Sequence, residues 1–204
     1  EDMDAPGGNV MRMNPPIRER AQQAPLLDAL RTGLIDMIST DHAPHTPAEK
    51  EGDAIWDIAC GFPGIETQLP LMMTLVNQGM LSLTRYAAIS SGAAARAWGL
   101  YGTKGVIRPG ADADLVLVDM KRTETLSAAR LSSRGKISPY EGMTVTGWPG
   151  ATLVRGRTVM RDGEISADEG GGREVRQVMP DPAPRNTHTH LATLCGQGPA
   201  RSGM

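Results

Sequence analysis

The sequence of 204 residues has 40% hydrophobic and 22% charged side chains, enough to bury the core of one large or two small domains. This composition excludes collagen-like, coiled-coil and wholly disordered proteins. The 21 basic and 23 acidic side chains give a net charge of −2 with no basic stripe, which argues against a nucleic-acid partner.

Membrane insertion and secretion are not expected either. The longest apolar stretch, Leu69 to Val76, is interrupted by Pro70 and is too short to cross a bilayer of about 30 Å. The chain starts with EDMDAPGGNV, which has neither an initiator Met nor a signal region and indicates the interior of a longer reading frame. The two cysteines, Cys60 and Cys195, make no metal-binding spacing and favour a reducing cytoplasm.

The first hundred residues alternate helical and strand-like patterns, which is typical of α/β proteins. A helix is predicted over 24–32, because Pro25 is tolerated in a first turn and Gly33 suits a C-terminal stop. A strand is predicted directly after it, over Ile35–Thr40. Polar residues follow the C-terminal end of this strand, where parallel α/β folds place their chemistry.

The pattern changes twice further along the chain. Between about 101 and 165, short β runs are separated by Gly, Pro and Asp turns such as Arg161-Asp162-Gly163, which predicts a small antiparallel β domain. From 166 to 204 the sequence is rich in Gly, Pro and Arg and lacks periodic apolar positions, which predicts a flexible tail. The expected boundaries are therefore 1–100, 101–165 and 166–204.

The polar residues after the predicted strand include one carboxylate and two imidazoles, at Asp41, His42 and His45. Oxygen and nitrogen donors held at a rigid strand end suit a catalytic metal site. The same residues could also form a surface turn in which Asp41 caps the following loop and both histidines are solvated. The spacing alone does not decide between these alternatives.

Several segments, in order, resemble the C-terminal half of a cyclic amidohydrolase, closest to bacterial dihydroorotase. The run Met13–Arg18 reads MNPPIR, Ile35–Lys50 reads IDMISTDHAPHTPAEK, and Gly64–Leu71 reads GIETQLPL. The segment Gly99–Asp119 and the later RGRTVMRDGEI resemble the closing β domain of dihydroorotases, hydantoinases and allantoinases. The resemblance implies the C-terminal part of a TIM-type (β/α)8 barrel followed by a small β-sandwich domain.

The resemblance also implies roles for particular residues. Asp41 matches the aspartate after the eighth barrel strand, which contacts a metal and carries a proton from the attacking hydroxide to the leaving nitrogen. Asn14 and His45 match positions that contact the substrate ring and its carboxylate. Cys60 and Gly61 stand in the substrate loop, where their backbone could grip the ring. His42 is expected to orient the loop rather than to bind metal.

The sequence departs from the family in two respects. Ala59-Cys60-Gly61 matches neither the Pro-Phe-Gly of dihydroorotases nor the Pro-Asn-Gly of hydantoinases, so the ring that is opened stays undecided. The binuclear zinc centre that the resemblance implies takes its histidines and carboxylated lysine from strands that precede this region, and only Asp41 is present here. We expect a chain that is inactive alone and that forms a homo-oligomer when full length.

Three hypotheses about the function remain open. The first is hydrolysis of dihydroorotate to N-carbamoyl-aspartate in pyrimidine metabolism. Hydantoinase (dihydropyrimidinase) or allantoinase activity on another small cyclic amide is the second, and a non-catalytic amidohydrolase-like subunit is the third.

Some other patterns are better explained by structure than by chemistry. His188 and His190 imitate a metal-binding His-x-His, but they follow a Pro-rich run and are expected to be solvated. Asp112 and Asp114 are expected to be exposed turn carboxylates rather than a metal pair. Glu66 is expected near the start of a helix, where a carboxylate is favoured by the helix dipole.

Overall fold

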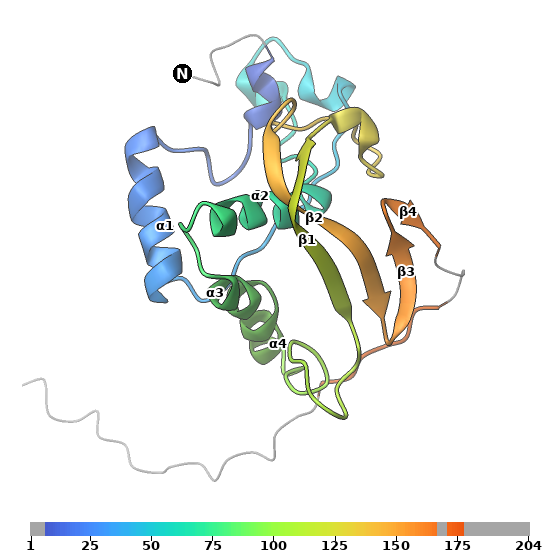
Figure 1. The fold of residues 1–204 in the computed structure, drawn as a ribbon. Helices are drawn as coiled ribbons and strands as arrows, with labels where there is room; N and C mark the ends of the chain where they lie inside the picture. Colours follow the sequence, from blue (N-terminus) through green and yellow to red (C-terminus); the bar gives the residue numbers. More distant parts are fainter. Residues whose placement is uncertain (1–6, 167–170, 178–204) are drawn as a thin grey trace, which may run out of the picture.

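The computed structural model describes residues 7–166 and 171–177 and contains a helical part followed by a small antiparallel sheet (Figure 1). The helices are α1 (Gln23–Thr32), α2 (Ile65–Asn77), α3 (Leu83–Ala87) and α4 (Ala93–Ala97). A π-helical turn, Ala88–Gly92, joins α3 to α4, so these three pieces form one continuous helical segment. The short 3-10 turns are Gly8–Met11, Arg20–Gln22, Ala48–Lys50, Ile55–Asp57 and Ala128–Arg130.

The sheet contains β1 (Leu115–Thr125), β2 (Thr144–Val154), β3 (Arg157–Arg161) and β4 (Glu164–Ile165), in this order and all antiparallel. The predicted antiparallel character of 101–165 is confirmed, although the described residues form a single sheet rather than both sheets of a sandwich. At the tight turn between β3 and β4, Asp162 and Gly163 both have positive φ, 49° and 90°. This geometry favours an Asp-Gly pair and matches the right-handed twist of a hairpin.

Helix α2 packs against the sheet at β2 (Figure 1). Gly147 permits this approach, because a Cβ at this position would stand 2.5 Å from the Cβ of Met73. Polar groups lock the same contact: Thr146 N donates to Thr74 Oγ1 at 2.9 Å, and Asn77 Nδ2 donates to Thr146 O at 3.0 Å. The core beside this contact is formed by Met73, Leu81, Tyr86 and Ile89, with Val118 and Met120 of β1 packed against it.

The prediction of a strand over Ile35–Thr40 is wrong. The segment belongs to no helix and to no strand of the described sheet, and Ile38 N donates instead to the carbonyl of Ile89 at 3.1 Å. An extended segment needs a neighbouring strand for its ladder of hydrogen bonds. The part of the chain that the structure describes offers none beside it, and its sheet contains no parallel strand.

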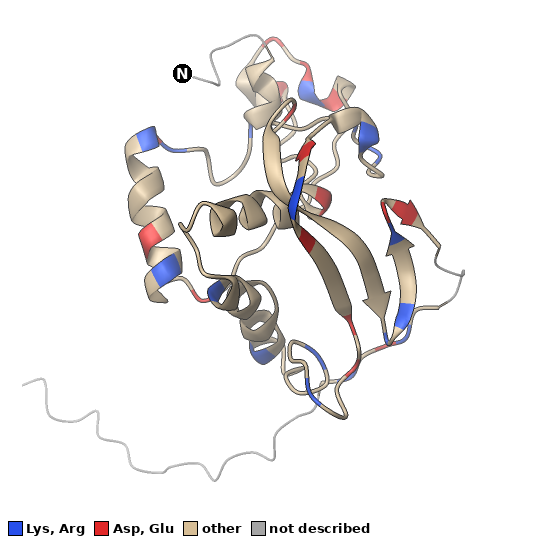
Figure 2. Ribbon diagram, in the orientation of Figure 1, with Lys and Arg blue, Asp and Glu red and all other residues tan. Residues whose placement is uncertain are grey.

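Other predictions are confirmed or lie outside the described residues. Helix α1 agrees with the predicted helix, and Gly33 ends it at φ 94°. The described helices include none that is long and apolar enough to cross a membrane. Figure 2 shows basic and acidic residues interspersed along the ribbon. Most of the predicted tail, including His188, His190 and Cys195, lies outside the described residues.

Candidate functional site

Three loops that carry the predicted site residues are joined by backbone hydrogen bonds. Gly61 N donates to the carbonyl of Arg12 at 2.8 Å, which links the Cys60–Gly61 loop to the segment of Asn14. Ala43 N donates to the carbonyl of Phe62 at 3.2 Å, which links the same loop to the segment 41–45. The loops that carry Asn14, Asp41, His45, Cys60 and Gly61 are therefore connected into one region.

Burial differs among these residues. Asn14, Asp41 and Cys60 are exposed, His45 is half-buried, and Gly61 is buried. Gly61 has φ 102°, and a Cβ at this position would stand 2.7 Å from the Cβ of Ala43. The site therefore requires glycine at 61 for both conformation and space. Because the amide of Gly61 is already bonded to Arg12, it is not free to grip a substrate ring.

Asp41 combines an accessible carboxylate with an unusual backbone. Its φ is 43°, in the left-handed region that few residues other than glycine adopt, although Asp and Asn tolerate it. Such conformations concentrate at functional sites, where the surrounding structure holds them in place. The hydrogen bonds of Ala43 and the neighbouring loops supply that support.

His42 binds the start of helix α2. Its Nδ1 accepts hydrogen bonds from Gly64 N at 3.1 Å and Ile65 N at 3.3 Å. These amides belong to the unpaired first turn of the helix, so the imidazole caps it. An accepting Nδ1 carries no proton, and the ring proton is then on Nε2. The predicted orienting role of His42 agrees with this geometry.

His45 lies beside an acidic side chain, and its backbone lies against the loop between β1 and β2 at Gly135. Its Nδ1 is 3.9 Å from Glu49 Oε2, which also accepts from Thr46 N at 2.7 Å and Thr46 Oγ1 at 2.8 Å. The hydrogen bond from the Thr46 backbone is the main cause that lowers the pKa of Glu49. Glu49 therefore stays ionised beside His45 at neutral pH.

Lys50 is a structural residue of the site that the sequence did not indicate. Its side chain is nearly fully buried, with 3% of its surface exposed, and Nζ donates to the carbonyls of Arg12 and Ala59, each at 2.8 Å. Burial lowers the pKa of this ammonium. The burial of a lysine within a polar run cannot be predicted from its neighbours in sequence. Only the tertiary contacts show that Lys50 is buried.

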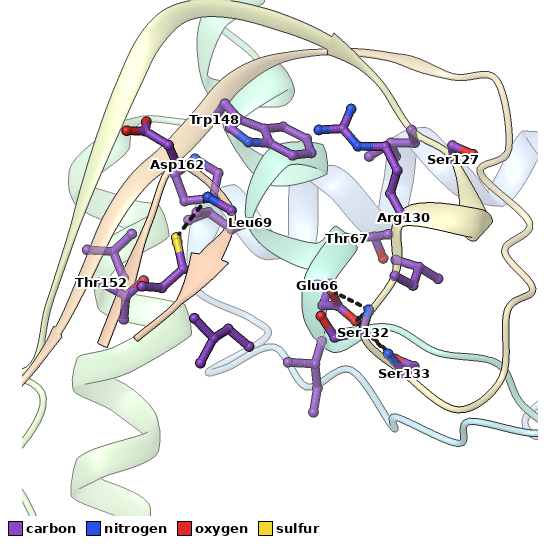
Figure 3. A pocket seen from close by; sticks show the side chains of 18 of the residues that line it. Glu66, Thr67, Leu69, Ser127, Arg130, Ser132, Ser133, Trp148, Thr152 and Asp162 are labelled. Carbon is purple, nitrogen blue, oxygen red and sulfur yellow. Dashed lines mark hydrogen bonds between the residues drawn. The ribbon is translucent and has the colours of Figure 1, made fainter. Parts of the chain in front are cut away.

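Glu66 connects α2 to the loop between β1 and β2. Its carboxylate accepts from Ser132 N at 2.9 Å, and from Ser133 N and Ser133 Oγ at 3.1 Å (Figure 3). Burial raises the pKa of Glu66, but these hydrogen bonds outweigh it and the net shift is downward. The predicted position at a helix start is confirmed, and the bonds to the serines add a second, long-range role.

A cavity of about 750 Å³ lies between α2 and the sheet. Figure 3 shows Glu66, Arg130 and Trp148 around it, and the Arg130 guanidinium carbon is 5.9 Å from the Trp148 ring centroid. Asn14, Asp41, His45 and Cys60 do not line this cavity. His42 does line it, so the cavity borders the region where the predicted site residues meet.

The described residues do not by themselves fit a zinc centre. No group of three or more His, Cys, Asp or Glu side chains in the described ranges could hold a metal ion. The alternative pair, Asp112 and Asp114, is bridged by the ammonium of Lys104, which lies 2.8 Å from Asp112 Oδ2 and also contacts Asp114. The two carboxylates therefore form an ion-pair network with Lys104, which the sequence did not indicate; Asp114 is exposed, as predicted, and Asp112 is half-buried.

The resemblance seen in the sequence is confirmed by comparison with known proteins. The amidohydrolase family model matches residues 13–159, and the chain belongs to the amidohydrolase family. A dihydroorotase of Halobacterium salinarum is 44% identical over 170 residues, which cover 83% of this chain and 39% of that protein. An L-hydantoinase of Paenarthrobacter aurescens is 37% identical over 171 residues, which cover 82% of this chain and 37% of that protein.

Solved structures agree with these relatives. The L-hydantoinase (dihydropyrimidinase) from Arthrobacter aurescens superposes with a TM-score of 0.76 at 37% identity, covering 79% of this chain and 36% of that one. A D-hydantoinase from Bacillus sp. AR9 gives a TM-score of 0.79 at 34% identity, covering 85% and 39%. The chain thus spans somewhat more than a third of the length of these relatives.

Proposed function

We propose that this chain is the carboxy-terminal part of a cyclic amidohydrolase of the dihydroorotase type, with Asp41 as its catalytic carboxylate. The observation that carries the proposal is the placement of Asp41. Its carboxylate is exposed on a left-handed backbone, in a chain 44% identical to a dihydroorotase. The loop of Asp41 is joined to the loops of the other expected substrate-binding residues.

The proposed reaction is the addition of water to a ring amide, as in conversion of dihydroorotate to N-carbamoyl-aspartate. The water oxygen bonds to the carbonyl carbon, the carbon–nitrogen bond of the ring breaks, and one proton must move from the water to the departing nitrogen. Asp41 accepts this proton as a base and returns it as an acid, since a carboxylate can perform both steps in turn. The product is the ring-opened N-carbamoyl compound with a new carboxyl group, which loses its remaining proton to water at neutral pH.

Substrate contacts are assigned to four residues. The amide of Asn14 offers donors and an acceptor to the ring, and the imidazole of His45 can donate to an anionic group. Cys60 and Gly61 contribute backbone groups of the substrate loop, but the Gly61 amide is excluded because Arg12 already accepts it. The carbonyl of Gly61 and the backbone of Cys60 are the groups that we assign to the ring.

The metal and the assembly belong to the same proposal. The described residues do not complete a zinc centre, so we assign only Asp41 as a ligand and place the other ligands outside the described residues. We also propose that the complete protein is a cytoplasmic homo-oligomer that acts on a small molecule.

Hydantoin or dihydropyrimidine hydrolysis is the second candidate function. It is favoured by the 37% identity to an L-hydantoinase and by the superposition on hydantoinase structures. Allantoin is a third possible substrate, and a non-catalytic subunit is the alternative outside the enzymes. The substrate loop, Ala59-Cys60-Gly61, does not select among them.

The test begins with the protein isolated from its native source, whose intact mass shows whether further sequence accompanies this chain. That protein is assayed against dihydroorotate, hydantoin, dihydrouracil and allantoin. We expect turnover of dihydroorotate, and Asp41→Asn should abolish it while the fold is retained, because Asn also tolerates the left-handed conformation. The control Asp53→Asn removes an exposed carboxylate and should leave turnover unchanged. Turnover of none of the four substrates would overturn the enzyme proposal.

A further inference from the structure

Lys50 is one of only two polar or charged residues that are buried in the described part of the chain, the other being Thr67. A buried ammonium is costly unless it is paired or fully hydrogen-bonded. None of the ion pairs among the described residues involves Lys50. Its Nζ donates instead to two neutral backbone carbonyls, those of Arg12 and Ala59.

These two carbonyls lie next to the proposed substrate contacts. Arg12 precedes Asn14 by two residues, and its carbonyl accepts from both Lys50 Nζ and Gly61 N, each at 2.8 Å. Ala59 immediately precedes Cys60 and Gly61, and its own amide donates to the carbonyl of Glu49 at 2.8 Å. Three backbone segments, 12–14, 49–50 and 59–61, are thereby joined around a single ammonium group.

The side chain itself does not face a substrate. Lys50 is 3% exposed, whereas Asn14 and Cys60 are both exposed on the segments that it binds. An ammonium carries three donors without a fixed plane, so it can bind carbonyls that arrive from different directions. A neutral side chain of the same length could fill the space but could not hold the two carbonyls.

We propose that Lys50 is a positioning residue, whose buried ammonium fixes the distance between the Asn14 segment and the Cys60–Gly61 loop and so sets the width of the substrate-binding side of the site. The inference rests on the proposed function of Asn14, Cys60 and Gly61. Lys50 acts through the carbonyls of Arg12 and Ala59 and takes no part in the chemical step. Its removal therefore affects the binding of the ring more than the rate of its opening.

The first experiment measures hydrogen exchange of the Gly61 amide in the full 204-residue chain. In Lys50→Met, which keeps the length of the side chain but removes the ammonium, Gly61 should exchange about tenfold faster, the size expected for loss of a charged hydrogen bond. The amide of Ile38, which donates to Ile89 away from this cluster, should keep its rate. The control Lys121→Met, at an exposed position, should change neither amide.

A second variant covers the case in which Lys50→Met does not fold. Lys50→Ala leaves a space that an added alkylammonium ion can enter, and propylammonium should restore the protection of Gly61 while propanol should not. If Gly61 keeps its wild-type protection in a folded Lys50→Met, the proposal is overturned. Equal rescue by propanol would also overturn it, because filled space alone would then explain the role of Lys50.

The second experiment is kinetic and uses the complete enzyme. Lys50→Met should raise KM for the cyclic amide by about tenfold while kcat changes by less than about threefold, the pattern for loss of uniform binding. Lys121→Met should leave both constants unchanged. A fall in kcat with unchanged KM would contradict the positioning role. If wild-type enzyme turns over no cyclic amide, the proposed function fails, whereas the exchange experiment still decides whether Lys50 holds the two loops.

Discussion

Gly135 lies directly against the backbone of His45. A Cβ at position 135 would stand 2.9 Å from the carbonyl carbons of both Pro44 and His45, and nearer still to the His45 carbonyl oxygen. Gly135 belongs to the loop between β1 and β2, so the sheet domain touches the candidate site at this point. Phe62 and Tyr140 add an edge-to-face ring contact at 6.0 Å between the same two parts of the chain.

This close approach predicts that Gly135→Ala displaces either its own loop or the backbone at Pro44 and His45. The structure has no open space for the methyl group, and overpacking of this kind costs about 1–3 kcal/mol. We expect a lower urea midpoint at unchanged m-value and shifted NMR signals of the His45 ring. Gly172→Ala is the control, because a Cβ there meets nothing within 4 Å. Equal midpoints for the two variants would contradict the contact.

The hydrogen bonds of Glu66 predict a pH dependence of stability. Burial raises the pKa of this carboxyl, but the bonds from Ser132 and Ser133 outweigh burial and lower it. A group whose pKa is lower in the folded state stabilises that state above its unfolded pKa, and this contribution is lost as the pH falls through the folded value. The stability of the wild-type chain should therefore decrease as the pH falls below about 4.5, the ordinary value for a Glu side chain.

The variant Glu66→Gln isolates this effect. Its free energy of unfolding should be lower than that of the wild type at pH 7, and the difference should shrink as the pH approaches 3. Urea unfolding at a series of pH values measures both. Glu51→Gln, which removes an exposed carboxylate from a nearby loop, is the matched control and should keep the wild-type pH profile. A constant difference between pH 7 and pH 3 would show that the bonds to the serines do not depend on the charge.

Features set by local sequence were predictable. Gly33 ends α1 and the pair Asp162-Gly163 forms the hairpin turn, because each needs only its own backbone conformation. The prediction of a strand over Ile35–Thr40 was wrong because a strand depends on a partner elsewhere in the chain. A β-strand is defined by a hydrogen-bonded neighbour, and an apolar run cannot specify that such a neighbour is present.

The supports of the candidate site were also beyond local reasoning. The loops were marked by Asp41, His45 and Asn14, but Lys50 reaches Arg12 across 38 positions of sequence and Glu66 reaches Ser132 across 66. No periodicity or spacing encodes such contacts. Sequence patterns thus identified side chains suited to catalysis or binding. The residues that hold their loops together were found only in the folded structure.

Substitution of Gly61 can separate two costs: that of a side chain at positive φ, and that of a steric clash with Ala43. Gly61→Ala places an L-residue at φ 102° and sets its Cβ 2.7 Å from that of Ala43. Gly163→Ala is the control, because Gly163 has φ 90° but no atom within 4 Å of a Cβ. We expect a loss of about 1 kcal/mol for Gly163→Ala and about 2–4 kcal/mol for Gly61→Ala. Thermal or urea unfolding measures both.

A double mutant then tests the crowding directly. Ala43→Gly removes the methyl group that Gly61→Ala would meet, so the two substitutions together should cost less than the sum of their separate costs. The expected coupling is about 1 kcal/mol, within the range of contacting pairs. Strict additivity would mean that the loop between Asp41 and His45 yields to the new methyl group without cost.

Lys104 offers a final test, at the turn that enters the sheet. Hydrogen bonds from its ammonium to Asp112, and then to Asp114, raise the pKa of Lys104. A raised pKa stabilises the folded state below the unfolded pKa, and this contribution disappears as the pH rises through the folded value. Lys104→Met should therefore lower the free energy of unfolding at pH 7 by about 1 kcal/mol, since the pair is partly exposed. The difference from wild type should narrow above about pH 10.5, the ordinary lysine value. The matched control is Lys121→Met, which removes an exposed ammonium and should remain within about 0.5 kcal/mol of wild type throughout. If Lys104→Met and Lys121→Met have the same free energy of unfolding at pH 7, the ion pairs of Lys104 with Asp112 and Asp114 do not stabilise the fold.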